Sequence, residues 1–342
     1  MKKIILVCIL ALAANSYPAG SYAADSGYHI LKRLKVGGDG GWDYLTVDSA
    51  ARRLYISRST HVMVVDLESE KVVGDIPDTP GVHGIALAPE LNRGFISNGK
   101  ADTATIFDLS TLKVLGVVKT GANPDCIIYD SASKRVFTFN GRSKDATIFE
   151  AATGKLVRTL KLGGKPEFAA ANGKGKVYVN IEDANKIVEI DSLKPHISRR
   201  FSLNSCVEPA GMGLDAEGGR IFSGCHNKVM TVLDTRAGKV IASIPIGGKV
   251  DANLFDAGTG LAFSSNGDGT LTVASETTTG KFEVVETVAT QPGSRTMALD
   301  SKTHTIYLPA ARFAQVKEAA QEGALQRPSM EPGSFEILVV GK

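Results

Sequence analysis

Leu54-Tyr55-Ile56-Ser57, preceded by Arg53, is the first of seven similar stretches in this chain. Each stretch centres on an aromatic residue among β-branched or other apolar residues, and the rest lie at residues 94–98, 136–140, 177–180, 221–223, 262–266 and 306–308. A basic residue begins five of them, with separations of 40, 42, 41 and 44 residues between Arg53, Arg93, Arg135, Lys176 and Arg220. A repeat of this length predicts a row of equivalent structural units.

Two more apolar stretches follow each aromatic one. The first ends in an acid, at Asp66, Asp108, Glu150, Asp191 and Asp234, and the second follows a Lys in four of the units. Short β-branched and aromatic runs between turn residues predict strands, and long runs with helical spacing are missing. Four strands per unit at this period are typical of propeller blades. The sequence therefore predicts an all-β fold, one seven-bladed β-propeller with four-stranded blades over residues 24–342.

The last repeat predicts how the ring closes. It has a third strand at residues 334–340, after which the chain ends without an outer strand. Residues 28–36 resemble the missing strand and are followed by Gly37-Gly38. Residues 155–164 and 239–248 end in Gly-Gly in the same way. We expect residues 28–36 to complete blade seven, because pairing the two ends removes a free edge. Residues 311–333 form an insertion in this blade, with a short helix at 315–324, and either pack on one face or form a lid over a ligand.

The N-terminus has the pattern of an export signal. Lys2 and Lys3 precede an apolar run at residues 4–14, which is too short to span a bilayer, and Ser21-Tyr22-Ala23 fits a cleavage site. Residues 1–23 are therefore predicted to be a cleaved signal peptide, and the protein is expected to be periplasmic. No other segment is apolar enough to span a membrane, and we expect a monomer.

Composition narrows the range of partners. Hydrophobic residues make up 43% of the 342 residues and charged residues 22%, which is globular composition and excludes a disordered chain. Removing residues 1–23 changes 39 basic residues to 37, against 36 acidic ones, so the net charge becomes +1. A strong nucleic-acid binder usually carries a concentrated positive excess, so overall charge does not favour nucleic acid, although a local patch stays open.

The repeat stretches also resemble a known family. Phe95-Ile96-Ser97-Asn98 and Tyr178-Val179-Asn180 resemble the YVTN-type β-propeller repeat, and residues 40–45 and 328–335 look like its YncE-like periplasmic branch. The resemblance implies a seven-bladed, exported and mostly non-catalytic protein. Some relatives bind single-stranded DNA, and others sit beside metal or redox systems. The family implies no catalytic motif.

One residue in each repeat is expected at a channel mouth. The connection from each outer strand to the next inner strand ends near the axis, at Asp43, His83, Asp125, Glu167, Glu208, Asp251 and Arg295, with separations of 40 to 44 residues. Five carboxylates and one Arg leave this ring strongly acidic, and crowded carboxylates take up protons, bind cations or stay hydrated. A divalent metal ion is the candidate cofactor, with Asp43, His83, Asp125, Glu167, Glu208 and Asp251 as candidate ligands.

Two other interpretations of this ring stay open. It is either a water-filled polar funnel that Arg295 and Arg58 partly neutralise, or a site for an anionic ligand on those two side chains. Trp42 and Tyr44 flank Asp43 in the sequence. Trp42 either packs at a blade junction or offers a stacking platform at the mouth for a base or a sugar.

Three cysteines follow the predicted signal peptide. Cys206 and Cys225 flank the first two strands of blade five, whose hairpin returns near its start, so a disulfide between them is expected. A soft-metal set with His226 is the alternative. Cys126 is expected to be a buried free thiol.

Enzyme signatures are missing from the sequence: it has no Gly-x-Ser-x-Gly elbow, His-Glu-x-x-His motif, Walker loop or Cys-x-x-Cys-His motif. The favoured hypothesis is a non-catalytic propeller that binds a small ligand, a metal ion or a protein partner at the ringed mouth. A metal-dependent hydrolase of the lactonase type is one alternative. Binding of single-stranded DNA through Trp42, Tyr44 and scattered Lys and Arg residues is another.

Overall fold

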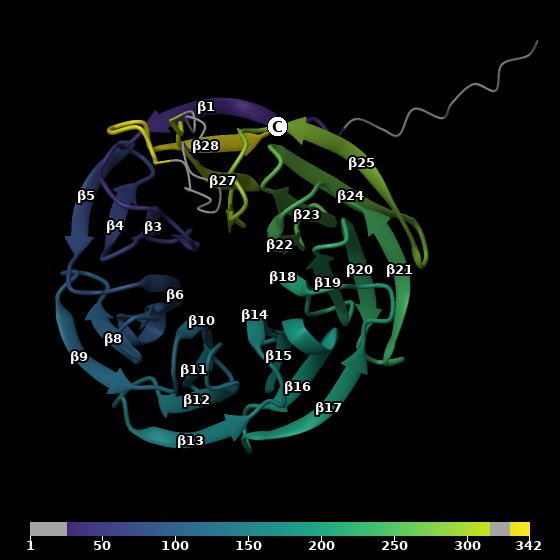
Figure 1. Cartoon of the computed structure of the whole chain (residues 1–342), viewed down its shortest axis with the longest axis horizontal. Helices are drawn as coiled ribbons and strands as arrows, with labels where there is room; N and C mark the ends of the chain where they lie inside the picture. The colour runs from purple at the N-terminus through teal and green to yellow at the C-terminus, as the bar shows by residue number, and fades with distance from the viewer. Residues whose placement is uncertain (1–25, 315–328) are drawn as a thin grey trace, which may run out of the picture.

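Seven antiparallel sheets of four strands each surround a central channel in the computed structural model, which describes residues 26–314 and 329–342 (Figure 1). The predicted all-β, seven-bladed β-propeller with four-stranded blades is confirmed. Each blade runs from the axis to the rim, so the first strand of a blade lines the channel and the last one forms its outer edge.

The first four blades follow the chain without interruption. Blade one has β2 (Leu45–Asp48), β3 (Arg53–Arg58), β4 (His61–Asp66) and β5 (Lys71–Ile76). Blade two has β6 (Val82–Ala88), β7 (Arg93–Asn98), β8 (Thr103–Asp108) and β9 (Val114–Lys119). Blade three has β10 (Pro124–Asp130), β11 (Arg135–Asn140), β12 (Asp145–Glu150) and β13 (Leu156–Lys161). Blade four has β14 (Pro166–Ala171), β15 (Lys176–Ile181), β16 (Lys186–Asp191) and β17 (His196–Ser202).

The remaining three blades include the one that closes the ring. Blade five has β18 (Pro209–Asp215), β19 (Arg220–Cys225), β20 (Val229–Asp234) and β21 (Lys239–Pro245). Blade six has β22 (Val250–Asp256), β23 (Leu261–Asn266), β24 (Thr270–Thr278) and β25 (Lys281–Ala289). Blade seven has β26 (Ala298–Asp300), β27 (Thr305–Ala310), β28 (Glu336–Gly341) and, as its outer strand, β1 (His29–Lys35). Single-turn 3-10 helices lie at Pro89–Leu91 and Glu182–Ala184.

The aromatic residue of each repeat packs between blades. The second strand of a blade is buried on both faces, so it reads as a continuous apolar run rather than an alternating one. The ring centroids of Tyr55 in blade one and Phe107 in blade two are 5.9 Å apart. Those of Phe95 in blade two and Phe149 in blade three are 6.0 Å apart. The core is therefore a series of blade interfaces, and one blade alone would expose both faces.

The basic residue that begins the repeat also joins neighbouring blades. The Nη1 of Arg53 donates a 2.6 Å hydrogen bond to the carbonyl of Leu109, in the last turn of blade two. Arg135 makes the same kind of bond, at 2.9 Å, to the carbonyl of Ser192 in blade four. At these positions the turn of the next blade presents a carbonyl to the cation, whereas Lys176 and Arg220 pair with carboxylates.

The predicted closure is confirmed. β1 pairs antiparallel with β28, with Leu34 opposite Ile337, so the two ends of the chain share one sheet (Figure 1). The outer strand of every blade carries a one-residue register shift, at the equivalent position each time. Such bulges twist the free edges and oppose pairing with another sheet.

Some expectations lie outside the described residues. Residues 1–23, the predicted signal peptide, are among them, and so is the short helix expected at 315–324. The described ends of the 311–333 insertion meet in a bridge between Phe313 and Met330, between β27 and β28 as expected. Among residues 26–314 and 329–342, no helix has the length and apolar character needed to cross a membrane.

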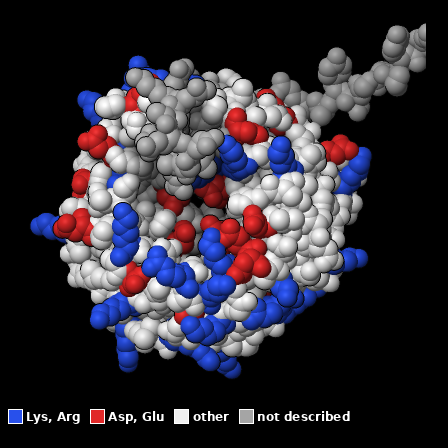
Figure 2. Space-filling model, in the orientation of Figure 1, with Lys and Arg blue, Asp and Glu red and all other residues white. Residues whose placement is uncertain are grey.

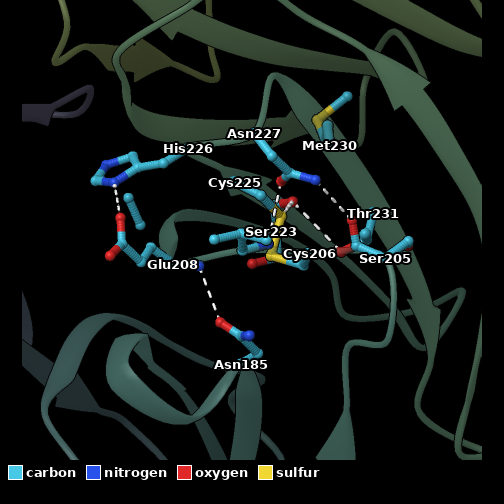
Figure 3. Close-up of a disulfide and its surroundings, with 12 residues drawn as sticks. Asn185, Ser205, Cys206, Glu208, Ser223, Cys225, His226, Asn227, Met230 and Thr231 are labelled. Atoms are coloured by element: carbon cyan, nitrogen blue, oxygen red, sulfur yellow. Dashed lines mark hydrogen bonds and ion pairs between the residues drawn. A yellow bond between two sulfur atoms is a disulfide. The ribbon is translucent and has the colours of Figure 1, made fainter.

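The structure pairs Cys206 with Cys225, whose Cα atoms are 5.4 Å apart (Figure 3). The bond links the loop before β18 to the end of β19, and both side chains are buried. Cys126 is a buried free thiol. Both predictions for these cysteines are therefore confirmed, and the alternative of a soft-metal set with Cys206, Cys225 and His226 does not fit, because the two sulfur atoms are bonded to each other.

Candidate functional site

Inner strands deliver one side chain each to the mouth of the channel. His83, Asp125, Glu167 and Asp251 are the second residues of β6, β10, β14 and β22. Together with residues just before β2 and β26, they line one cavity of about 210 Å³, formed by Asp43, Tyr44, His83, Asp125, Glu167, Asp251, Arg295 and Thr296. Acidic side chains are visible inside the opening in Figure 2. The repeat thus converts one sequence position per blade into a cluster around the axis.

Glu208 does not belong to this cluster. It lies before β18 and its carboxylate is 3.0 Å from Nδ1 of His226, with 56% of its side chain exposed (Figure 3). The second residue of β18 is Ala210, so the prediction that Glu208 occupies the ring position of blade five is wrong by two residues. The reason is a change of order around a shared proline. In blades three and four the acid follows Pro124 and Pro166, whereas in blade five it precedes Pro209.

Arg58 is also displaced from its predicted place. Its side chain is fully buried, and the guanidinium donates 2.9 Å hydrogen bonds to the carbonyls of Gly37, Gly38, Asp39 and Gly40. The guanidinium carbon lies 3.7 Å from the centre of the Phe335 ring. Arg58 therefore holds the loop between β1 and β2 against the last blade and does not line the cavity, so it cannot neutralise the ring as expected.

Trp42 and Tyr44 lie on either side of Asp43 with different surroundings. The Trp42 ring packs against Phe313 and Phe335, at 5.9 and 5.3 Å between centroids, which is the blade-junction packing that was one of its two interpretations. One edge of the indole also borders a larger opening beside the cavity. Tyr44 lines the cavity itself and packs against Phe168 at 5.2 Å.

Three of the ring residues form a cluster with metal-ligand spacing. Nδ1 of His83 donates a 2.6 Å hydrogen bond to Asp43, and lies 3.8 Å from Oδ1 of Asp125. One potential ligand atom from each of the three residues lies within 4.8 Å of the other two. Each comes from a different blade junction, so the cluster exists only when the ring is assembled.

Serines of the repeat stretch hold the backbone of the ring residues. The hydroxyl of Ser57 accepts a 2.9 Å hydrogen bond from the Asp43 amide. In other blades the serine hydroxyl donates to the carbonyl of a ring residue, from Ser97 to Asp125 and from Ser265 to Arg295. The aromatic-apolar-Ser pattern of the sequence therefore both packs a blade and fixes the ring position beside it.

Burial and mutual repulsion raise the pKa values of the acidic groups in the cavity. Burial, and then the charge of Asp43, raise the pKa of Asp125 to about 7. Burial, and then the charge of Asp125, raise the pKa of Glu167 to about 8. Burial alone would lower the pKa of His83, but the hydrogen bond to Asp43 and the nearby carboxylates raise it to about 9. Protons therefore offset part of the charge around neutral pH, as expected for crowded carboxylates.

Two cations offset the rest of the charge. Arg295 pairs with Asp251, the ring residue of the neighbouring blade. Lys165 pairs with Glu182 and lies 3.3 Å from Oε2 of Glu167. That oxygen is buried and accepts no hydrogen bond from any residue in the described part of the chain. Its one polar contact in the described part of the chain is therefore the ion pair with Lys165.

Two wider openings adjoin the cavity and carry positive charge. One, of about 560 Å³, shares Asp43, His83 and Arg295 with the cavity and is also lined by Lys100 and Arg142. The other, of about 400 Å³, shares Asp251 and Arg295 with it and is also lined by Lys249 and His226. Figure 2 shows Lys and Arg side chains gathered around the acidic opening. Sequence reasoning missed these residues, although Lys100 and Arg142 occupy the same position after the second strand of adjacent blades.

Comparisons with known proteins support the architecture. No family model and no curated protein matches the chain, so the likeness to the YVTN-type repeats is carried by the repeat residues alone. A chain of Kuenenia stuttgartiensis hydrazine synthase matches with a TM-score of 0.70 and 14% identity, over 85% of this chain and 95% of that one. A chain of the mitotic checkpoint complex matches with a TM-score of 0.73 and 12% identity, over 90% and 96%. At these identities the likeness shows the fold alone.

Proposed function

We propose that this protein is an exported, non-catalytic binding protein that holds a divalent metal ion at the mouth of its channel, with Asp43, His83 and Asp125 as ligands. The observation that carries the proposal is the mutual approach of these three groups to within 4.8 Å at the edge of a cavity. Export through residues 1–23 to the periplasm is part of the proposal and rests on the sequence pattern.

The donor set suits a borderline metal ion. Two carboxylates and one imidazole are ligands for zinc and manganese, whereas calcium prefers oxygen donors only. A dication would also replace the protons that now offset the charge of the buried carboxylates. Metal binding at this cluster should therefore release protons, because the ligands must be deprotonated to bind.

Neighbouring groups fit the same role. Glu167 and Asp251 line the cavity beside the three ligands and add negative charge that favours a cation. The backbone of Asp43 is fixed from two sides, since its carbonyl also accepts a 2.6 Å hydrogen bond from the Thr296 hydroxyl. A fixed backbone lowers the cost of ordering the ligands when the ion binds.

Calorimetry on chelator-treated, dialysed protein tests the proposal. Zn²⁺ and Mn²⁺ are titrated separately, in two buffers with different heats of ionisation. We expect one site per chain and a heat that depends on the buffer, because protons leave. Asp43→Asn and Asp125→Asn should each weaken binding by roughly tenfold or more, while Glu208→Gln, which changes an exposed carboxylate outside the cavity, should not. Absence of binding, or equal binding by all variants, would refute the proposal.

A metal-dependent hydrolase of the lactonase type is the second candidate. The observation that favours it is the cavity of about 210 Å³ next to the three ligands, which leaves room for a substrate carbonyl at the ion. A panel of lactones, assayed with Zn²⁺ or Mn²⁺ added, separates the two functions. Hydrolysis that disappears in Asp125→Asn favours the enzyme, and metal binding without hydrolysis favours the binding protein.

A further inference from the structure

We infer that the ion is bound at this mouth as an anionic chelate, a complex of the metal with a small organic acid, rather than as a bare cation. The inference rests on the proposed function and names its ligand class. It follows from the placement of charge, because acidic residues lie in the central cavity and positive side chains line the wider openings around it.

The central cavity provides too few ligands to surround a metal ion. Asp43, His83 and Asp125 offer three ligand atoms. Structural zinc sites are closed by four protein ligands, whereas sites with three keep a position open for another molecule. Here the open side faces the cavity and the wider opening that shares Asp43 and His83 with it. A donor from a bound small molecule can therefore reach the ion from that side.

Three positive side chains in the openings have no partner of their own. Lys100 and Arg142 line the larger opening and Lys249 lines the other one, and all three are exposed. None of the three side chains forms a hydrogen bond or an ion pair with another residue of the described chain. Arg295, which borders both openings, is by contrast paired with Asp251. The openings therefore present free positive charge next to an acidic cavity.

This arrangement opposes the entry of a bare dication and favours an anionic complex. A free metal ion must pass Lys100 and Arg142 in one opening or Lys249 in the other, and these like charges lower its local concentration and its affinity. Free carboxylates on a bound organic acid would turn the repulsion by these positive side chains into attraction. Asn123 and Trp42 also line the opening that contains Lys100 and Arg142. Openings of about 560 and 400 Å³ are in the size range of small-molecule sites.

Equilibrium dialysis of the full chain with radiolabelled zinc and radiolabelled citrate tests the inference. We expect both labels to be retained together, in equal amounts, and citrate alone not to be retained. The triple variant Lys100→Glu, Arg142→Glu and Lys249→Glu should reduce citrate retention by roughly tenfold or more while zinc alone still binds as well or better. The triple variant Lys71→Glu, Lys113→Glu and Lys155→Glu makes the same total charge change at exposed positions that border none of the three openings, and is the matched control.

Three results would overturn the inference. Citrate that strips zinc from the protein would show a site for the bare ion. Citrate retained equally without zinc would show a site for anions only. An unchanged citrate label in the folded triple variant, with its thermal melt matched to the control, would show that the positive side chains have no part. Failure of zinc alone to bind would instead refute the proposed function, so the two failures are distinguishable.

Discussion

Nδ1 of His83 lies 2.6 Å from a carboxylate oxygen of Asp43, although forty residues separate them in the sequence. His83 is in the first strand of blade two and Asp43 lies just before the first strand of blade one. The repeat creates this contact, because each blade adds one inner strand beside the last and its ring position falls next to that of its neighbour. The candidate site is therefore a property of the assembled ring.

The first prediction concerns the pH dependence of stability. The pKa values of Asp125, Glu167 and His83 are raised to about 7, 8 and 9, from 3.8, 4.5 and 6.5. The native state therefore holds protons that the unfolded chain has released, so stability falls as pH rises from about 5 to 9. We expect a continuous loss in the free energy of unfolding across this window.

Urea unfolding at several pH values, with a chelator present, measures this loss. Glu167→Gln keeps the shape of the side chain and removes its titration, so the dependence should become shallower. Glu208→Gln removes an exposed carboxylate and should leave the slope as it is. Stability that rises between pH 5 and 9 in the unaltered protein would contradict the charge distribution described for the cavity.

Replacing Arg58 should destabilise the closed ring. In Arg58→Met the carbonyls of residues 37–40 would lose their donor while staying near the buried Phe335 ring. We expect a loss of about 3 kcal/mol, because unpaired buried polar groups are costly. Arg33→Met is the control, since Arg33 is exposed and pairs with Glu336 at the surface. Equal thermal melts for the two variants would show that the buried contacts of Arg58 add nothing.

Removing the N-terminal strand should lower stability far more than its size suggests. A chain that begins at residue 37 lacks β1 and leaves β28 as an unpaired edge. The truncation also removes Tyr28, whose buried ring packs against Phe263 of blade six with 5.0 Å between ring centroids. We expect a sharp drop in melting temperature and a greater tendency to associate, because an edge strand is exposed. A melt equal to that of a chain beginning at residue 24 would refute this role.

The disulfide should stabilise blade five measurably. Cys206 and Cys225 are 19 residues apart, and a bridge of that span is worth about 3 kcal/mol. Replacing both by Ala should lower the free energy of unfolding by about that amount. Thiol counting in denatured, unreduced protein that begins at residue 24 should find Cys126 alone. A count of three thiols would show that the bridge does not form.

Much of the fold could be predicted from the sequence because the repeat encodes it directly. The aromatic residue recurs in every blade, the preceding cation in five of the seven and the following Ser in four, and the contacts described above join neighbouring blades. The Gly-Gly ending shared by the N-terminal segment and two outer strands was enough to place β1. Equivalent positions face equivalent neighbours in a ring, so a periodic pattern determines architecture well.

The site was less predictable, since it depends on departures from the repeat. Glu208 has the right chemistry two residues before the ring position, and only the shared proline indicates that Ala210 occupies it. Arg58 stands where blades two, three and six have an Asn, and nothing in its own stretch predicts that its guanidinium binds the carbonyls of residues 37–40. Lys100, Arg142 and Lys249 belong to turns, whose path determines which opening a side chain borders.

The most direct test of the central claim is anomalous diffraction from crystals soaked with Zn²⁺ or Mn²⁺. The account predicts one strong peak within coordination distance of Asp43, His83 and Asp125, which disappears in Asp43→Asn crystals. A peak at Glu208 and His226 instead, or no peak at the channel mouth at saturating metal, would contradict it.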